Sequence, residues 1–317
     1  MSFLVRLPET AYRHDAFNSF SAVAQDFALG NAQAMMWLSQ LAYETDDGEK
    51  INRILTRFGL DLLDFGTNEV FAGFFRRQAC FIVARGQGAT FIAFSGTDPL
   101  KPQDVITDLT ATQTLEGLHK GFAESVKAVQ SKVADAIGSG GAGQPLFFAG
   151  HSLGGALATI SALRARDAGF QVKAVYTYGG ARAGGRQFFD SYGPGLGNCT
   201  FRLVHGKDIV ASVPPSSLDG LLGGLLGDFH HVGRLLHCQQ RSTFAGQAPT
   251  KNHGNEPDDF LKGGINTVLD IIGHTPSLKI LRQLDPRSLD DPNNDLPEEV
   301  RDHVPASYFR ALQMPLA

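Results

Sequence analysis

The central part of the chain alternates between short apolar runs and longer stretches with helical periodicity. Apolar residues recur at helical spacing over 122–137, and Ala and Leu dominate 153–166, so both stretches are predicted to be helices. The short apolar runs have the length and composition of buried strands and occupy 79–84, 89–94, 145–149, 172–178 and 201–204. The glycines at 86 and 88 predict a hairpin between the first two strands. This order predicts a mainly parallel sheet covered by helices on both faces.

The pattern is less regular outside this region. Residues 31–43 have the spacing of an amphipathic helix, and 258–272 repeat that spacing near the C-terminus. Residues 216–229 contain an unusual run of Leu and Gly, whereas 239–256 are polar and predict a loop. No internal repeat and no interdomain linker is evident, so we expect one domain over 1–317.

Composition narrows the class of protein. Of the 317 residues, 43% are hydrophobic and 19% charged, which supports a sizeable core and excludes a disordered chain. The net charge of −4, without a long basic block, argues against nucleic acid as the main partner. No apolar run is long enough to span a membrane, so we expect no transmembrane segment.

The cysteines and the N-terminal residues bear on the cellular compartment. Cys80, Cys199 and Cys238 are few, odd in number and widely spaced, which favours a reducing compartment over a disulfide framework. Arg6 and Pro8 interrupt the only apolar stretch near the start, so no Sec signal peptide is expected. The sequence therefore predicts a cytoplasmic location or export by a route that needs no such signal.

The candidate nucleophile is Ser152, in the run Gly150-His151-Ser152-Leu153-Gly154. A pentapeptide of the form G-x-S-x-G is weak evidence in a glycine-rich chain, but here a predicted strand leads directly into it and a predicted helix follows. This strand–turn–helix arrangement is the nucleophile elbow of α/β-hydrolases, in which small neighbours permit a strained serine backbone. We therefore expect an α/β-hydrolase fold with Ser152 as its nucleophile.

A nucleophilic serine needs a base and an orienting acid, which follow it in the order Ser, Asp or Glu, His in this fold. Among the later carboxylates, Asp208 stands out because it follows the strand at 201–204, at the sheet edge where catalytic groups gather. The base is chosen from a larger set. Position near the C-terminus and before a predicted helix favours His303 over the other candidates, which are His230, His231, His237, His253 and His274.

These residues resemble the motifs of the class 3 lipases, a family that includes the Rhizomucor-type fungal lipases with bacterial and plant relatives. The resemblance extends over about 31–312, and Gly150 to Gly155 match its elbow. The other matching segments are Phe94-Ser95-Gly96-Thr97, His119-Lys120-Gly121-Phe122, Tyr178 to Gly184, Asp208 to Pro215, and Asp302-His303 with Tyr308. One departure is Ala181, where the family has proline, and the stretch from His231 to His303 is long.

The resemblance implies a triad of Ser152, Asp208 and His303, with His231 as the alternative base. It also implies that the backbone amides of Thr97 and Leu153 form the oxyanion hole. The chemistry requires no cofactor, and we expect no metal because the histidines and cysteine over 230–238 lack the spacing of a common zinc site.

The function expected from these features is a serine carboxylester hydrolase, a lipase acting on acylglycerols or other lipid esters at a lipid–water interface. Phospholipase A1 and short-chain esterase activity remain open on the same triad, as does acyl transfer. A lipid-binding protein on a decayed hydrolase fold is the non-enzymatic alternative. Candidate lid or cap elements lie within 98–115, 216–229 and 239–300.

Overall fold

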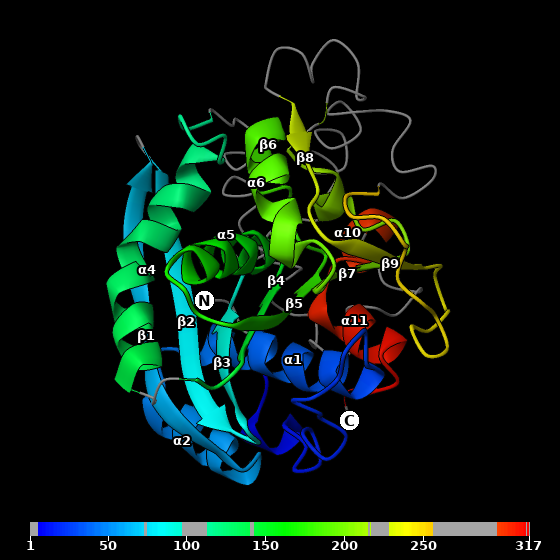
Figure 1. Ribbon diagram of the computed structural model, residues 1–317. Helices are drawn as coiled ribbons and strands as arrows, with labels where there is room; N and C mark the ends of the chain where they lie inside the picture. Colours follow the sequence, from blue (N-terminus) through cyan, green and yellow to red (C-terminus); the bar gives the residue numbers. More distant parts are fainter. Residues whose placement is uncertain are drawn as a thin grey trace.

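A seven-stranded sheet forms the centre of the molecule (Figure 1). The computed structural model describes residues 6–72, 75–96, 113–139, 143–214, 216, 228–255, 297–314 and 316. In sheet order the strands are β1 (Leu60–Ala72), β2 (Phe75–Gly86), β3 (Ala89–Phe94), β4 (Leu146–His151), β5 (Val172–Tyr178), β7 (Thr200–His205) and β9 (Arg234–Cys238). Strands β1, β2 and β3 pair antiparallel, and the sheet is parallel from β3 to β9. The predicted hairpin and the mainly parallel sheet are therefore confirmed.

Helices cover both faces of the sheet. In chain order they are α1 (Leu29–Leu41), α2 (Gly48–Arg57), α4 (Lys120–Ser139), α5 (Leu153–Asp167), α6 (Arg186–Leu196), α10 (Glu298–Arg301) and α11 (Pro305–Ala311), with the short turns η1 (Glu9–Ala11), η2 (Ala42–Glu44) and η3 (Ile209–Ser212). A small second sheet pairs β6 (Gly184–Gly185) with β8 (Phe229–His230). Figure 1 shows α4, α5 and α6 over one face, while α1 and α11 pack together against the other.

The two faces of the sheet bury separate apolar clusters. Phe91 and Phe147 point toward the cluster that holds α1, α2 and α11, whereas Ile92 and Phe148 point toward the cluster that holds α4, α5 and α6. Successive side chains of a strand point to opposite faces, so a strand covered on both sides must be apolar at every position. This explains why the central strands are continuous apolar runs in the sequence.

The structure differs from the prediction mainly at the edges of the sheet. The outer strands β1 and β9 were not predicted, because their apolar residues are interrupted by polar ones. The predicted helix over 258–272 lies outside the described residues. The candidate lid segments 98–115, 216–229 and 239–300 also lie largely outside them, and the prediction of one domain over 1–317 stays a prediction.

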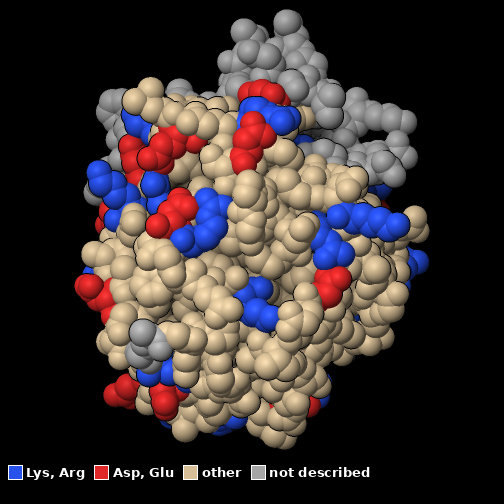
Figure 2. All heavy atoms as spheres, viewed as in Figure 1, with Lys and Arg blue, Asp and Glu red and all other residues tan. Residues whose placement is uncertain are grey.

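Charged side chains of both signs are interspersed on the described surface seen in Figure 2. Several form local ion pairs, such as Arg186 with Asp190 on α6 at 2.9 Å. Exposed pairs of this kind contribute little to stability, about 0–1 kcal/mol each. Among the described helices, none combines the length and the apolar character that a membrane crossing requires.

The parallel strands place the candidate functional residues at one edge of the sheet. Ser152 directly follows β4, and Asp208 follows β7 by three residues. Since β4 and β7 point the same way, both residues emerge at the carboxyl edge, where α/β proteins assemble their sites. His303 lies between α10 and α11 and reaches the same edge from the end of the chain.

Candidate active site

The turn between β4 and α5 holds Ser152 in a strained backbone conformation, with φ 60° and ψ −130°. Gly150 and Gly154 make the turn possible. A Cβ atom at Gly150 would lie 2.0 Å from the carbonyl oxygen of Gly154, and one at Gly154 would lie 2.4 Å from that of Phe94. Only glycine fits at either position. The predicted nucleophile elbow is therefore present, and its strain is the kind that structures retain at functional sites.

His303 connects Ser152 to Asp208. Its Nε2 lies 2.9 Å from Ser152 Oγ, and its Nδ1 lies 2.9 and 3.0 Å from the two carboxylate oxygens of Asp208. An ionised carboxylate only accepts hydrogen bonds, so Nδ1 carries a proton and Nε2 of the neutral ring accepts the serine hydroxyl. All three residues are buried, with Asp208 completely inaccessible. The structure thus brings together the three residues expected to form the triad.

Asp208 is buried, yet its surroundings favour the charged form. Burial alone would raise its pKa, but the positive charge of protonated His303 and the hydrogen bonds from His303 and Tyr308 outweigh this and hold the pKa below its ordinary value. Tyr308 donates its hydroxyl proton to Oδ2 at 2.5 Å, and the Val210 amide donates to Oδ1 at 2.9 Å. Asp208 is therefore prepared to orient the imidazole and to stabilise its positive charge.

Replacing Tyr308 by phenylalanine removes one of these donors and keeps the ring. Because the pKa of Asp208 is lowered in the folded protein, its stabilising contribution is present above the ordinary aspartate pKa of about 4 and is lost as the pH falls through the lowered value. Tyr308→Phe raises that pKa toward its ordinary value. We expect the free energy of unfolding near neutral pH to fall by about 1–3 kcal/mol. Urea unfolding over a series of pH values measures the effect.

The matched control is Tyr192→Phe. Tyr192 is equally buried, but its hydroxyl meets the neutral hydroxyl of Thr200 at 2.7 Å. Its loss of stability should not depend on pH in the acid range, whereas the loss caused by Tyr308→Phe should shrink at acid pH. A Tyr308→Phe difference that stays constant across the acid range would contradict the assigned role of Tyr308.

A second chain of hydrogen bonds runs behind the triad through His151 and Tyr43. His151 Nε2 lies 2.8 Å from the carbonyl oxygen of His303, which only accepts, so Nε2 carries the proton. Nδ1 then accepts the hydroxyl proton of Tyr43 at 2.9 Å, and the Tyr43 oxygen accepts the amide of Gly96 at 3.0 Å. The donor directions are all fixed by the two ends. The chain links the end of β3 to the backbone of His303.

His151 is neutral in this arrangement. Burial and the nearby charge of His303 lower its pKa to about 3. Its ring stacks on that of His303, with centroids 4.7 Å apart. A neutral ring can stack there without repelling a positively charged His303 ring. The geometry thus makes His151 a positioning residue and not a second base.

Asp302 ties the His303 segment to the loop that carries Asp208. Its Oδ2 accepts the Lys207 amide at 2.8 Å and the Gln240 side-chain amide at 2.9 Å. Burial raises the pKa of Asp302, and these bonds offset part of that effect. Neither Tyr43 nor the role of Asp302 was found from the sequence, because no local pattern relates residues 43 and 151, or 240 and 302.

The oxyanion side of the site is described only in part. Leu153 is the first residue of α5, so its backbone amide has no acceptor within the helix and lies at the positive end of the helix dipole. It is therefore available to a developing negative charge. Thr97 lies outside the described residues, which reach Gly96 on this side.

His231, the alternative base, is not at Ser152. It is buried, and its Nε2 lies 2.6 Å from the carbonyl oxygen of Ala211. The neighbouring His230 meets Asp228 at 2.9 Å, and His237 meets the carbonyl oxygen of Gly206 at 2.8 Å. These three rings thus have separate partners. The structure brings His303, and not His231, to the nucleophile.

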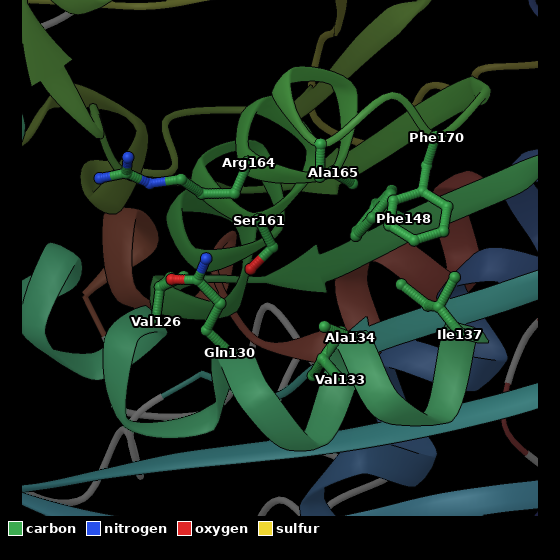
Figure 3. Close-up of a pocket in the computed structure, with 11 residues that line it drawn as sticks. Val126, Gln130, Val133, Ala134, Ile137, Phe148, Ser161, Arg164, Ala165 and Phe170 are labelled. Carbon is green, nitrogen blue, oxygen red and sulfur yellow. The ribbon is translucent and has the colours of Figure 1, made fainter. Parts of the chain in front are cut away.

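A small apolar hollow between α4 and α5 is separate from this site (Figure 3). Phe148, Val133, Ile137 and Ser161 are among the residues that line it, and its volume is about 60 Å³. Ser152 lies at the start of α5, and Ser161 lies within α5 nine residues later. This separation corresponds to a rise of about 13 Å along the helix. The hollow is too small for an acyl chain and too distant to supply the ester pocket.

The sheet, the strained serine turn and the hydrogen-bonded Ser152, His303 and Asp208 define the α/β-hydrolase fold with a serine-hydrolase arrangement. Residues 91–218 match the family model described as "Lipase (class 3)". This segment contains both Ser152 and Asp208, so the part of the chain that carries the candidate site is similar to the class 3 lipases. The resemblance inferred from the sequence motifs is confirmed.

Curated and solved relatives agree with this assignment. A "Secreted mono- and diacylglycerol lipase 1" of Fusarium solani is 36% identical over 102 residues, which is 31% of this chain and 30% of that protein. "Phospholipase A1-Igamma1, chloroplastic" of Arabidopsis thaliana is 36% identical over 112 residues, 30% of this chain and 22% of that protein. Lipase II from Rhizopus niveus superposes with a TM-score of 0.56 at 18% identity, over 73% of this chain and 89% of that chain.

The two groups of relatives support different conclusions. The matches to the curated relatives span less than a third of the length of either protein. The solved structure covers most of both chains, but its identity is low, so it shows the fold alone. The fold is therefore established and residues 91–218 match the class 3 lipases, while the activity of the whole chain is a matter for proposal.

The expected cytoplasmic location is contradicted by these comparisons, since the Fusarium relative is named as a secreted lipase. All three cysteines are unpaired in the structure, and two of them are buried. A chain that builds a large apolar core needs no disulfide in any compartment, so cysteine usage did not indicate where the protein works.

Proposed function

We propose that this chain hydrolyses carboxylic esters of lipids, with Ser152 as nucleophile, His303 as base and Asp208 as the orienting acid. The observation that carries the proposal is the unbroken line of contacts from Ser152 Oγ through His303 to Asp208, all within 3.0 Å. A serine in a strained turn with a base at hydrogen-bond distance and the base held by a carboxylate is the arrangement used for acyl transfer.

The reaction proceeds in two halves. Ser152 Oγ attacks the ester carbonyl carbon as its proton passes to His303 Nε2, and the carbonyl oxygen becomes an oxyanion. The intermediate collapses, and the alcohol leaves with the proton from Nε2, so that an acyl-Ser152 ester remains. Water then attacks this ester, gives its proton to Nε2, and releases the carboxylic acid while Ser152 regains its proton.

Backbone amides stabilise the oxyanion in both halves. The amide of Leu153 is free of intrahelical bonds, and we propose the amide of Thr97 as the second donor. Donors of this kind are typically worth about 10²–10³ in rate each. Asp208 keeps the proton on Nδ1 of His303 and faces the positive charge that the ring gains. This chemistry runs on the chain's own side chains and amides.

The substrate class we propose is the acylglycerols, presented at a lipid–water interface. The Fusarium relative is named as a mono- and diacylglycerol lipase. Phospholipase A1 activity is the second candidate, because the Arabidopsis relative carries that name at the same identity. Both reactions use the same acyl-enzyme and differ only in the alcohol that leaves.

The first experiment labels the folded protein with a fluorophosphonate and maps the adduct by peptide mass spectrometry. We expect the adduct on Ser152 and none after prior heat denaturation, since only an activated serine reacts. Ser161→Ala, a substitution of another serine of α5, should leave the labelling unchanged. Absence of an adduct on Ser152 in the folded protein would support the decayed, lipid-binding alternative and overturn the proposal.

A substrate series then separates the ester classes. Mono- and diacylglycerols, phosphatidylcholine and p-nitrophenyl esters of increasing chain length are compared by kcat/KM, with released fatty acid measured directly. Highest kcat/KM on acylglycerols supports the proposed class. Preference for phosphatidylcholine cleaved at its first acyl position would replace it by phospholipase A1, and preference for short soluble esters would replace it by an esterase.

A further inference from the structure

A second cavity, lined only by polar residues, lies beside the segment that carries His303. Its volume is about 260 Å³. It is bordered by the ends of β7 and β9, since His205 is the last residue of β7 and Gln240 follows β9 by two residues. The opposite wall comes from the segment of α10 and α11. All of its lining residues are polar or charged types, which suits a charged or strongly polar group better than an acyl chain.

The lining of this cavity is rich in arginine. Arg241, Arg301 and Arg310 are three of its lining residues, and Asp302 is the only carboxylate residue among them. The Asp302 carboxylate already has partners within the protein. Its Oδ2 accepts hydrogen bonds from the Lys207 amide and the Gln240 side chain, and its Oδ1 lies 3.5 Å from His205 Nδ1. The charge of the lining is therefore strongly positive, and Asp302 is not bonded to the arginines.

Two of the three arginines lack side-chain partners. Among the described residues, the side chains of Arg241 and Arg301 form no hydrogen bond or ion pair. Arg241 and Arg301 carry like charges, and an anion bound between them would offset their mutual repulsion. By contrast, arginines elsewhere on the described surface, such as Arg53 and Arg186, are paired with carboxylates.

The backbone at Arg241 is also unusual. Its φ is +60°, in the left-handed region that favours glycine or asparagine. A bulky residue held in this conformation carries strain, and such strain is concentrated at sites where the side chain is needed. The turn after β9 thus presents a guanidinium to the cavity at a conformational cost.

From these observations we infer that the cavity is a binding site for a phosphate-type oxyanion, held by Arg241, Arg301 and Arg310. The planar guanidinium fork matches the oxygens of a phosphate group and can bond two of them at once. The cavity volume accommodates one such group with bound water. The anion can come from a phospholipid headgroup or from a free phosphate or phosphate monoester, and both present the same chemistry to the arginines.

Such a site would connect to the catalytic segment without taking part in ester cleavage. Arg301 is two residues before His303, and its carbonyl oxygen accepts the Ser307 hydroxyl at 2.7 Å. An anion shared by Arg301 and Arg241 joins this segment to the turn after β9. Occupancy of the cavity therefore stabilises the folded protein, and this effect is independent of the proposed ester hydrolysis.

The test titrates inorganic phosphate at constant ionic strength and follows Tm and calorimetric heat. Arg241→Asn and Arg301→Gln are compared with Arg53→Gln, which removes an exposed arginine from α2. We expect phosphate to raise the Tm of the wild type and of Arg53→Gln, and each cavity variant to bind phosphate about tenfold more weakly or worse. Without phosphate, Arg241→Asn should keep or raise the Tm, because asparagine tolerates the positive φ.

Vesicles distinguish the two sources of the anion. Ser152→Ala protein, which cannot turn over lipid in the proposed mechanism, is mixed with phosphatidylcholine vesicles with and without phosphatidic acid. Binding that requires phosphatidic acid and both arginines identifies a lipid headgroup, whereas phosphate binding without vesicle binding identifies a free anion. Phosphate that has no effect, or that acts equally on the wild type and on both cavity variants, would overturn the inference, since general exclusion of phosphate from protein surfaces stabilises all variants alike.

Discussion

Ser152→Ala is expected to lower kcat/KM for ester hydrolysis by about 10⁴-fold or more, which corresponds to about 5 kcal/mol of transition-state stabilisation. The hydroxyl removed is the atom that forms the acyl bond, and no other hydroxyl of the described residues accepts a hydrogen bond from or donates one to His303 Nε2. Alanine fits the space left by serine, so the turn between β4 and α5 should persist. Initial rates on a soluble p-nitrophenyl ester, with active protein normalised by folded fraction, measure the loss.

The same loss is expected from His303→Ala and from the double variant, because residues that act as one unit are not additive in their effects. Ser161→Ala is the matched control and should retain wild-type kcat/KM. If the double variant is slower than either single variant by a further large factor, then Ser152 and His303 do not act in one step, and the assigned mechanism is wrong.

Asp208→Asn is expected to lower kcat by about 10⁴-fold while leaving the fold intact. Asparagine has the shape of aspartate, but its amide group donates where the carboxylate accepted. Turned toward His303, that group forces Nδ1 to accept, so the ring proton moves to Nε2 and blocks proton transfer from Ser152. The variant also loses the negative charge that faces the imidazolium. Steady-state kinetics from neutral to alkaline pH measure the effect.

Asp190→Asn, which changes a surface carboxylate of α6, is the control for the chemical change and should behave as wild type. Circular dichroism and the Tm of Asp208→Asn confirm that the comparison is between folded proteins. A variant that retains kcat within about tenfold of the wild type would show that the carboxylate is not needed to set the tautomer of His303.

The nucleophile and the central strands could be predicted because their signals are local. The run before Ser152 is apolar at every position since β4 is covered on both faces, and the glycines at 150 and 154 are required by contacts within the turn itself. Asp208 was found by the same logic, as a carboxylate in the loop that follows a buried strand. The family resemblance at 91–218 rests on these local segments.

The base could be selected only from six candidates, because proximity to Ser152 depends on how the end of the chain folds back. In the structure His303 lies at hydrogen-bond distance from Ser152, while His231 is bound to the carbonyl of Ala211, and this geometry is the reason for proposing His303. The edge strand β1 escaped prediction since it pairs with one neighbour and mixes polar residues into its pattern. Tyr43 gave no signal, because its phenol meets His151 across 108 positions of sequence.

The hydrogen-bond chain from Gly96 through Tyr43 and His151 to the carbonyl of His303 has a consequence for dissecting this enzyme fold. Tyr43 belongs to the N-terminal part of the chain, and His303 lies between the last two helices. Both are hydrogen-bonded to His151, the residue that precedes Ser152. The segment that carries the family signature is therefore not a module that can be excised or transplanted by itself. A fragment that keeps this hydrogen-bond chain has to include the residues from Tyr43 to His303.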